Sequence, residues 1–241
     1  MSKILFFLSF TIFLFANENK LLLNEQELLW IQNNPVVKVG AKEKWAPFSM
    51  YVKGKHEGLS SDYLKIISRK TGLKFNYIFD SWNNLEKKII ASEIDIIPTA
   101  YFDKKIKKHV SFSSPYLSII DYFFVHKSIK AVNFSDLKGL TLALPKGYFR
   151  IDLIRKEMPY LKIIETKNLS SAISAVLERK ADILFGSYSV LSHLMRKHSI
   201  LEIVPFKENP FNNGSDLHII TSKKKAILAS IIEKTLKSIS E

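Results

Sequence analysis

The chain has 241 residues, of which 46% are hydrophobic and 24% are charged, and its formal net charge is +13. These proportions are typical of a folded globular chain and exclude a disordered or low-complexity protein. The absence of cysteine excludes disulfide bonds, thiolate metal sites and cysteine nucleophiles. The length accommodates either one large domain or two lobes of about 100 residues each.

The first 16 residues have the pattern of a secretory signal peptide. Lys3 precedes a mostly apolar run from Ile4 to Phe15, and Ala16 follows that run. A short positive segment followed by roughly 7–15 apolar residues is typical of such a leader, whereas a membrane-spanning helix needs about 20. We therefore expect residues 1–16 to be removed during export to the periplasm. An uncleaved N-terminal anchor is the alternative.

The excess of basic residues is spread along the chain. The densest groups of lysines lie within residues 104–108 and 223–225. Scattered lysines are typical of solvated faces, whereas a nucleic-acid-binding surface concentrates them on one face. We therefore expect no nucleic-acid partner.

Strands and helices alternate in the part of the chain that follows the leader. Asn24 and Glu27 have the spacing of a capping box, which opens a helix that ends before Pro35. Hydrophobic periodicity then predicts strands over 36–40, 74–79 and 94–99, and helices over 60–70 and 83–91. This β-α-β-α-β order is typical of a parallel sheet covered by helices.

A second α/β series follows an interruption, in which 112–116 is predicted as a loop and 119–126 as a long β-prone stretch. The elements predicted beyond it are helices over 135–139, 150–157, 170–180, 187–197 and 226–239, strands over 141–144, 162–165, 182–185, 201–204 and 217–221, and a turn at 212–214. Two α/β units joined by two extended segments imply two lobes with a cleft between them. Ligands of such sheets bind beyond the carboxyl ends of the strands.

This order of elements predicts a division of the chain into lobes. We expect an N-terminal helix within 17–35, a first lobe over 36–126 and a second lobe over 127–216. The last segment, 217–241, is expected to return to the first lobe. The chain would then cross between the lobes twice.

The sequence contains no motif of nucleotide or metal chemistry. Neither a G-x-G-x-x-G fingerprint nor a P-loop is present. The six histidines lack the spacing of metal ligands; His193 and His198 would point to different faces of one helix. Gly186 and Ser187 lack the flanking residues of a nucleophile elbow. We therefore expect no cofactor, no metal site and no catalytic residue.

Phrases in a fixed order along residues 24–241 resemble the family 3 solute-binding proteins. The phrases are VKVGAKEKWAPFS (37–49), EGLSSDYLKIISRKTGLKF (57–75), SEIDIIPTA (92–100) and VSFSSPY (110–116) for a first lobe, and SDLKGLTLALPKGY (135–148), AISAVLERKADILFGS (172–187) and AILASIIEKTLKSISE (226–241) for a second lobe and a returning helix. The chain is especially similar to the Venus-flytrap sensor domains of histidine kinases and diguanylate cyclases. The resemblance implies an α/β, two-lobed, type II periplasmic-binding-protein-like fold with two hinge crossovers.

The same resemblance assigns ligand-binding positions, which lie after strand ends and at the starts of helices. These positions are Trp45, Phe48, Leu59, Thr99, Tyr101, Tyr116, Lys146, Tyr148 and Ser187. Ordinary roles remain open for several of them. Trp45 and Phe48 could be core aromatics, Tyr101 and Tyr116 could cap strand ends, and Lys146 could be a surface lysine. Ser187 is also predicted as a helix N-cap.

Two positions depart from the amino-acid binders of the family. Those proteins place an Arg six residues before the position of Phe112, where this chain has Ile106, and an acidic residue where this chain has Ser187. The Arg and the acid pair with the α-carboxylate and the α-ammonium of the ligand. We therefore expect a ligand that is not an α-amino acid, although a lysine within 104–108 could replace the Arg.

The predicted ligand is a small anionic or aromatic molecule. Lys146 and the helix start that follows it offer a site for an anion, and Trp45, Tyr101 and Tyr148 offer aromatic faces. Hinge closure around this ligand would act either as the signal of a sensor kinase or cyclase or as the delivery form for a membrane permease. A cyclic-acid dehydratase on the same scaffold is the alternative. It would need an acid or base in the cleft, and no Glu or His falls at the assigned positions.

Overall fold

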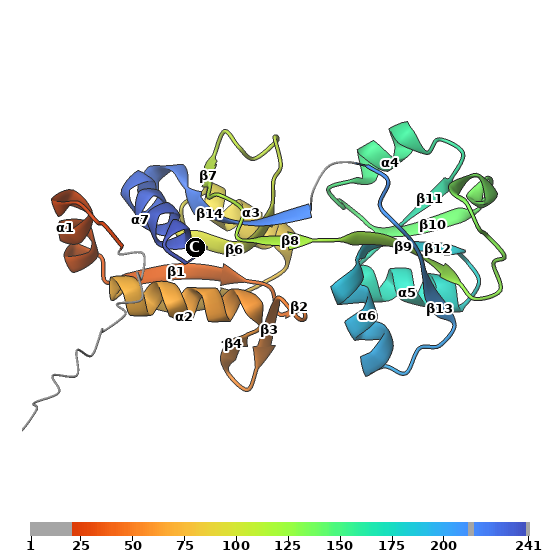
Figure 1. Ribbon diagram of the computed structural model, residues 1–241, viewed down its shortest axis with the longest axis horizontal. Helices are drawn as coiled ribbons and strands as arrows, with labels where there is room; N and C mark the ends of the chain where they lie inside the picture. The colour runs from red at the N-terminus through yellow and green to blue at the C-terminus, as the bar shows by residue number, and fades with distance from the viewer. Residues whose placement is uncertain (1–20, 212–214, 240–241) are drawn as a thin grey trace, which may run out of the picture.

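The computed structural model describes residues 21–211 and 215–239, which form two lobes lying side by side along the long axis of the molecule (Figure 1). The expected signal peptide and the turn predicted at 212–214 lie outside the described residues. Each lobe contains a sheet whose first three strands in order are parallel, with helices on both faces. The predicted two-lobed α/β fold is confirmed.

Lobe 1 contains both the first and the last elements of the described chain. Its elements are α1 (Glu25–Asn33), β1 (Val36–Ala41), β2 (Lys44–Trp45), β3 (Ser49–Val52), β4 (Lys55–Glu57), α2 (Leu59–Thr71), β5 (Lys74–Phe79), α3 (Trp82–Ile90), β6 (Ile96–Tyr101), β7 (Val110–Phe112) and β8 (Leu117–Ile119), followed after lobe 2 by β14 (Ser215–Ser222), a 3-10 turn (Lys223–Lys225) and α7 (Ala226–Lys237). The main sheet has the order β5-β1-β6-β14-β7, and β8 pairs with β14. Strands β2, β3 and β4 form a separate three-stranded sheet.

The strands of lobe 1 bury side chains on both faces because helices cover both. On one face, Val39 of β1 packs in a cluster with Leu64 of α2 and Ile231 of α7. On the other face, Leu85 of α3 packs in a cluster with Ile97 of β6. The central strands are therefore packed on both faces, and the loops at the carboxyl ends of β1 and β6 begin from well-packed strands.

Lobe 2 repeats this layered arrangement. Its elements are β9 (Asp121–His126), a 3-10 helix (Phe134–Leu137), β10 (Thr141–Pro145), α4 (Ile151–Glu157), β11 (Lys162–Thr166), α5 (Leu169–Leu177), β12 (Ile183–Ser187), α6 (Tyr188–Lys197) and β13 (Ile203–Glu208). The sheet has the order β11-β10-β12-β9-β13. Alternating residues of β12 face opposite sides: Phe185 packs with Ile154 of α4, and Leu184 packs with Val176 of α5.

The expected boundary between the lobes was wrong by several residues. β9 pairs with β12 and β13 and so belongs to the sheet of lobe 2, whereas β8 pairs with β14 of lobe 1. The first crossing therefore lies at Ile120, and the stretch predicted as one strand over 119–126 is divided between the two lobes. The sequence cannot reveal this division, because apolar and polar residues alternate with a period of two in any strand, whichever sheet the strand joins.

Other elements differ from expectation in smaller ways. The predicted helix at 135–139 is the 3-10 helix Phe134–Leu137, and the strand expected at 201–204 is β13, which runs further along β9. The β2–β4 sheet was not predicted, because its strands are only two to four residues long. No helix of the described residues is long and apolar enough to cross a bilayer.

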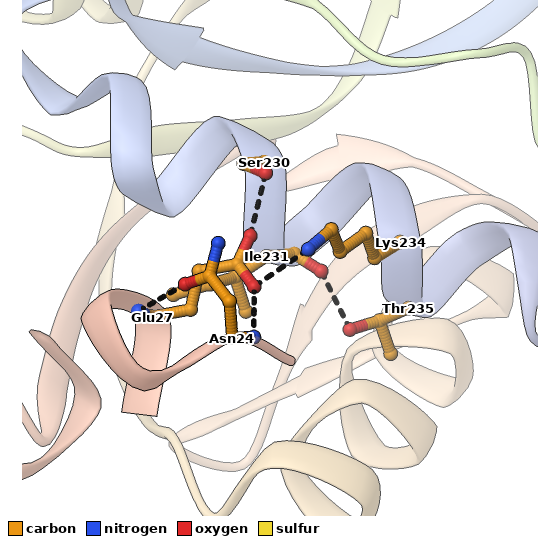
Figure 2. A network of polar contacts seen from close by, with 6 residues as sticks. All are labelled: Asn24, Glu27, Ser230, Ile231, Lys234 and Thr235. Carbon is orange, nitrogen blue, oxygen red and sulfur yellow. Dashed lines mark hydrogen bonds and ion pairs between the residues drawn. The ribbon is translucent and has the colours of Figure 1, made fainter. Parts of the chain in front are cut away.

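A polar network ties the first helix to the last one (Figure 2). The carboxylate of the buried Glu27 accepts hydrogen bonds from the Asn24 backbone N–H (2.8 Å), the Ser230 hydroxyl (2.6 Å) and the Lys234 ammonium (2.8 Å). Asn24 and Glu27 also complete the predicted capping box. The network fixes α1 against α7, at the end of lobe 1 farthest from lobe 2 (Figure 1).

Candidate ligand-binding site between the lobes

The wall of lobe 1 that faces the other lobe is built from segments that follow the carboxyl ends of β1 and β6. Trp45 lies in β2, shortly after β1, and Tyr101 is the last residue of β6. The Trp45 ring lies 5.0 Å from the ring of Phe48 and meets the Tyr101 ring edge-on at 5.9 Å. These rings form a continuous aromatic surface.

The turn that carries this surface is held by the start of α2. The Ser60 hydroxyl and backbone N–H both donate to the carbonyl oxygen of Phe48, at 2.6 and 3.0 Å. Gly58 has a φ of +105°, and a Cβ at this position would lie 2.6 Å from the carbonyl oxygen of Pro47. Only glycine allows this close approach, so the local sequence fixes where Phe48 lies.

The wall of lobe 2 is built from the loop after β10 and the start of α4. Tyr148 packs edge-on against Phe185 with ring centroids 6.1 Å apart, and Phe149 follows it. Arg150 is the N-cap residue of α4. Its guanidinium lies 4.8 Å from the centroid of the Phe149 ring.

The two walls touch each other. The rings of Tyr101 and Phe149 stack with centroids 4.3 Å apart and planes 13° from parallel. Phe48 of lobe 1 lies in one apolar cluster with Val190 of α6. At the surface, Lys105 and Asp152 form an ion pair of 3.4 Å across the junction. The described structure is therefore a closed arrangement of the lobes.

A buried ion pair lies behind the lobe 2 wall. The Arg150 Nε donates to Oδ2 of Asp121 at 3.1 Å, and the two side chains are 3% and 0% exposed. Burial, reinforced by the Asp121 charge, raises the pKa of Tyr101 and of Tyr148 well above the usual value. Both phenols therefore remain protonated and can act as hydrogen-bond donors to a ligand.

Lys42 lies against the lobe 1 wall, directly after the end of β1. Its ammonium is 3.9 Å from the centroid of the Trp45 ring and 5.0 Å from that of Trp82. Burial lowers the pKa of Lys42 to about 7. The site thus contains one cation that is only marginally charged at neutral pH.

The structure separates the positions expected from the sequence into two groups. Trp45, Phe48, Tyr101 and Tyr148 take part in the aromatic walls described above. Thr99 is fully buried, and within the described residues its hydroxyl has no hydrogen-bond partner.

The remaining expected positions have structural contacts or lie at the surface. The Tyr116 hydroxyl donates to the Pro98 carbonyl at 2.7 Å, and the Ser187 hydroxyl caps α6 by accepting from the Val190 N–H. Leu59 is 41% exposed at the start of α2. Lys146 is exposed, and its backbone N–H donates to Thr166.

Sequence reasoning did not single out five residues of this junction: Lys42, Trp82, Asp121, Phe149 and Arg150. Lys42 follows a predicted strand end, and Phe149 and Arg150 follow Tyr148 in the same loop, so counting further along each loop would have included them. Trp82 and Asp121 carry no local signal, because only packing brings them to the junction.

The residue that replaces the family's ligand-binding Arg is part of the core. Ile106 is 3% exposed and packs with Leu85 and Val110. Among its lysine neighbours, Lys105 pairs with Asp152, and Lys107 lies 5.6 Å from the Phe102 ring. In the part of the chain that the structure describes, no group of three acidic or histidine side chains could hold a metal ion.

Two α/β lobes, two hinge crossings and an aromatic junction between the lobes define a Venus-flytrap solute-binding domain. The model of the bacterial extracellular solute-binding proteins, family 3, matches residues 37–241, and the chain belongs to this family.

Its relatives include large sensor proteins. Over 220 residues the chain is 26% identical to the virulence sensor protein BvgS of Bordetella pertussis, a match that covers 89% of this chain and 18% of BvgS. It is 27% identical over 219 residues to the sensor protein EvgS of Escherichia coli K12, covering 90% and 18%. The chain therefore spans less than a fifth of the length of these relatives.

Among solved structures, the periplasmic VFT2 domain of Bordetella pertussis BvgS superposes with a TM-score of 0.83. The two sequences are 25% identical, and the match covers 90% of this chain and 93% of that domain. The chain is thus similar to the sensor Venus-flytrap domains, as expected from the sequence.

Proposed function

We propose that this chain is the periplasmic, non-enzymatic ligand-sensing domain of a signalling receptor. The observation that carries the proposal is the match to one Venus-flytrap domain of a sensor protein over nearly the full length of both. A sensor kinase or cyclase is the proposed partner. Ligand occupancy would change the relative stability of the open and closed lobes, and this difference would be the signal.

The proposed ligand is a small molecule other than an α-amino acid. An α-amino acid brings a carboxylate and an ammonium that both need partners, and leaving either buried and unpaired costs several kcal/mol. Ile106 lies in the core, and Ser187 caps a helix. The ion pair of Arg150 with Asp121 already engages the strongest charges near the junction. The aromatic walls favour a flat or apolar ligand that carries an anionic group.

A thermal-shift screen of metabolites on residues 17–241 tests the proposal. Several anionic or aromatic compounds should raise the melting temperature, because a ligand that binds only the folded state stabilises it by mass action. Common amino acids should leave it unchanged. A sub-micromolar dissociation constant for an amino acid by calorimetry would contradict the proposed ligand class, and the absence of any stabilising compound would contradict ligand sensing.

A further inference from the structure

The side chain of Lys42 has an unusual environment for a lysine. Trp45 of β2 and Trp82 of α3 both lie within 5.0 Å of its ammonium, measured to the ring centroids. Among residues 21–211 and 215–239, no hydrogen bond or ion pair to this ammonium is found. Other lysines near the ends of the same sheet have carboxylate partners: Lys88 with Asp80, and Lys225 with Asp95.

Three carboxylates near Lys42 in the chain or near α3 have other hydrogen-bond partners or lie in solvent. Asp80 accepts from Lys88 at 2.7 Å. Glu86 has its pKa raised by burial and is hydrogen-bonded to Trp82. Glu43 is exposed. Within the described residues, none of these three carboxylates therefore forms an ion pair with the Lys42 ammonium.

The energetics of this position are unfavourable without a ligand. A cation over an aromatic ring gains about 0.5–2 kcal/mol, whereas burying an unpaired ammonium costs several kcal/mol. The lowered pKa of Lys42 reflects this balance, since burial is its cause. A buried charge without a partner is typical of a group that meets its partner only when a ligand binds.

Lys42 is also next to the junction between the lobes. The Trp45 ring that it contacts meets Tyr101 edge-on, and Tyr101 stacks on Phe149 of lobe 2. One aromatic ring therefore separates the ammonium from the surface on which the lobes close. A ligand that contacts Trp45 at this junction would therefore share that ring with Lys42.

We infer that Lys42 is the residue that recognises the anionic group of the ligand, with Trp45 and Trp82 flanking that group. This inference rests on the proposed function, because it assumes that a ligand binds between the lobes. It assigns the charge recognition to Lys42 rather than to Lys146, which is exposed. The chemical class recognised is a small planar or apolar monocarboxylate.

The first test measures the stability of the free protein. Lys42→Met removes the charge and keeps most of the length of the side chain, so the melting temperature at pH 7 should rise. Lys146→Met, the matched control at an exposed lysine, should leave it unchanged. If Lys42 has only a structural role through its contacts with the two rings, Lys42→Met lowers the melting temperature, and that result overturns the inference.

The second test uses carboxylates and their neutral amides as probes of equal shape. Benzoate, phenylacetate and cyclohexanecarboxylate, each beside its amide, are titrated while NMR follows the Lys42 side chain. At least one carboxylate should raise the pKa of Lys42 and bind at least tenfold more tightly than its amide. Lys42→Met should abolish this preference, and Lys146→Met should retain it. A Lys42 pKa that no carboxylate moves overturns the inference.

The third measurement is the pH dependence of carboxylate binding. Above pH 7 the free Lys42 loses its proton, so the dissociation constant should rise up to tenfold between pH 7.5 and 8.5. Lys42→Arg keeps its charge in this range and should remove the dependence. Tyr101, whose pKa burial raises, stays protonated there, and Asp80, whose pKa the hydrogen bonds from Lys88 and Asn84 lower to about 2, stays ionised. The other charged side chains named near Lys42 are Glu43 and Glu86. If the dissociation constant depends on pH equally in the wild type and in Lys42→Arg, Lys42 is not the residue that recognises the carboxylate.

These outcomes separate the inference from the proposed function. If the metabolite screen finds a ligand that is neutral or cationic, ligand sensing stands and the role of Lys42 is overturned. If neither the screen nor the carboxylates stabilise the protein, both are overturned.

Discussion

At the scale of single residues, His56 connects the stability of lobe 1 with pH. Its Nε2 lies 3.1 Å from the Ser49 hydroxyl and 3.3 Å from that of Ser60, and the ring is 5% exposed. Burial, together with the nearby charge of Lys65, lowers the pKa of His56 to about 4. The folded protein therefore contains the neutral form of the His56 ring at neutral pH.

We predict that the domain loses stability in mild acid because of His56. An unfolded histidine titrates near pH 6.5, so between about pH 6.5 and 4 the unfolded chain binds the proton more readily than the folded one. The free energy of unfolding should fall through this window by about 3 kcal/mol, at about 1.4 kcal/mol per pKa unit. Urea denaturation at several pH values measures it.

Two variants define the contribution of this residue. His56→Gln should flatten the pH dependence between pH 6.5 and 4, at the cost of lower stability at pH 7. His109→Gln changes an exposed histidine and should follow the wild-type curve. An unchanged slope in His56→Gln would assign the acid sensitivity to other groups.

At the scale of elements, the contact between α1 and α7 depends on one carboxylate. Burial alone would raise the pKa of Glu27, but the hydrogen bonds from Lys234, Ser230 and Asn24 hold it below the usual value. The stability gained from these bonds is present above the unfolded-state pKa of about 4.3 and is lost as the pH falls through the folded-state value.

We predict that Glu27→Ala lowers the free energy of unfolding by about 2–3 kcal/mol at pH 7, since it removes a charged hydrogen-bond acceptor and one half of the capping box. Hydrogen exchange in α1 should accelerate more than exchange in lobe 2. Glu25→Ala, in the same first turn but exposed, should change stability by less than about 0.5 kcal/mol. Equal effects of the two variants would show that the network of Figure 2 adds nothing beyond local helix charge.

At the scale of the whole molecule, closure of the lobes depends on the stacking of Tyr101 on Phe149. An aromatic pair contributes about 0.5–1.5 kcal/mol beyond its buried area, and the other described contacts across the junction include one exposed ion pair, Lys105–Asp152. Exposed pairs of this kind contribute about 0–1 kcal/mol. The aromatic pair is therefore the larger of these two contributions, beside the apolar cluster of Phe48 with Val190.

We predict that Phe149→Ala shifts the free domain toward an open form. Small-angle X-ray scattering should give a larger radius of gyration than that of the wild type, with an unchanged circular-dichroism spectrum. Phe102→Ala, which removes an exposed aromatic ring packed within lobe 1, should keep the wild-type radius. A compact Phe149→Ala protein would mean that other contacts hold the lobes together.

The sequence by itself determined the layered α/β architecture and the two-lobed division, because periodicity and helix caps are local. The capping box of Asn24 and Glu27 and the N-cap at Ser187 followed from residue types a few positions apart. The resemblance to the solute-binding family assigned Trp45 and Tyr101 to the ligand site, and the predicted strands place both residues after strand ends, where ligands of parallel sheets bind.

Only the tertiary structure decided which strand belongs to which lobe and which charges are paired. The division between β8 and β9 depends on partners far along the chain, and so does the ion pair of Arg150 with Asp121. In the sequence, only its place after a predicted strand end distinguishes Lys42 from the other lysines. Its proposed role emerges only because Trp45 and Trp82, 37 positions apart by their numbers, both lie against its ammonium. Desolvation depends on what surrounds a group in space, and spacing along the chain does not reveal it.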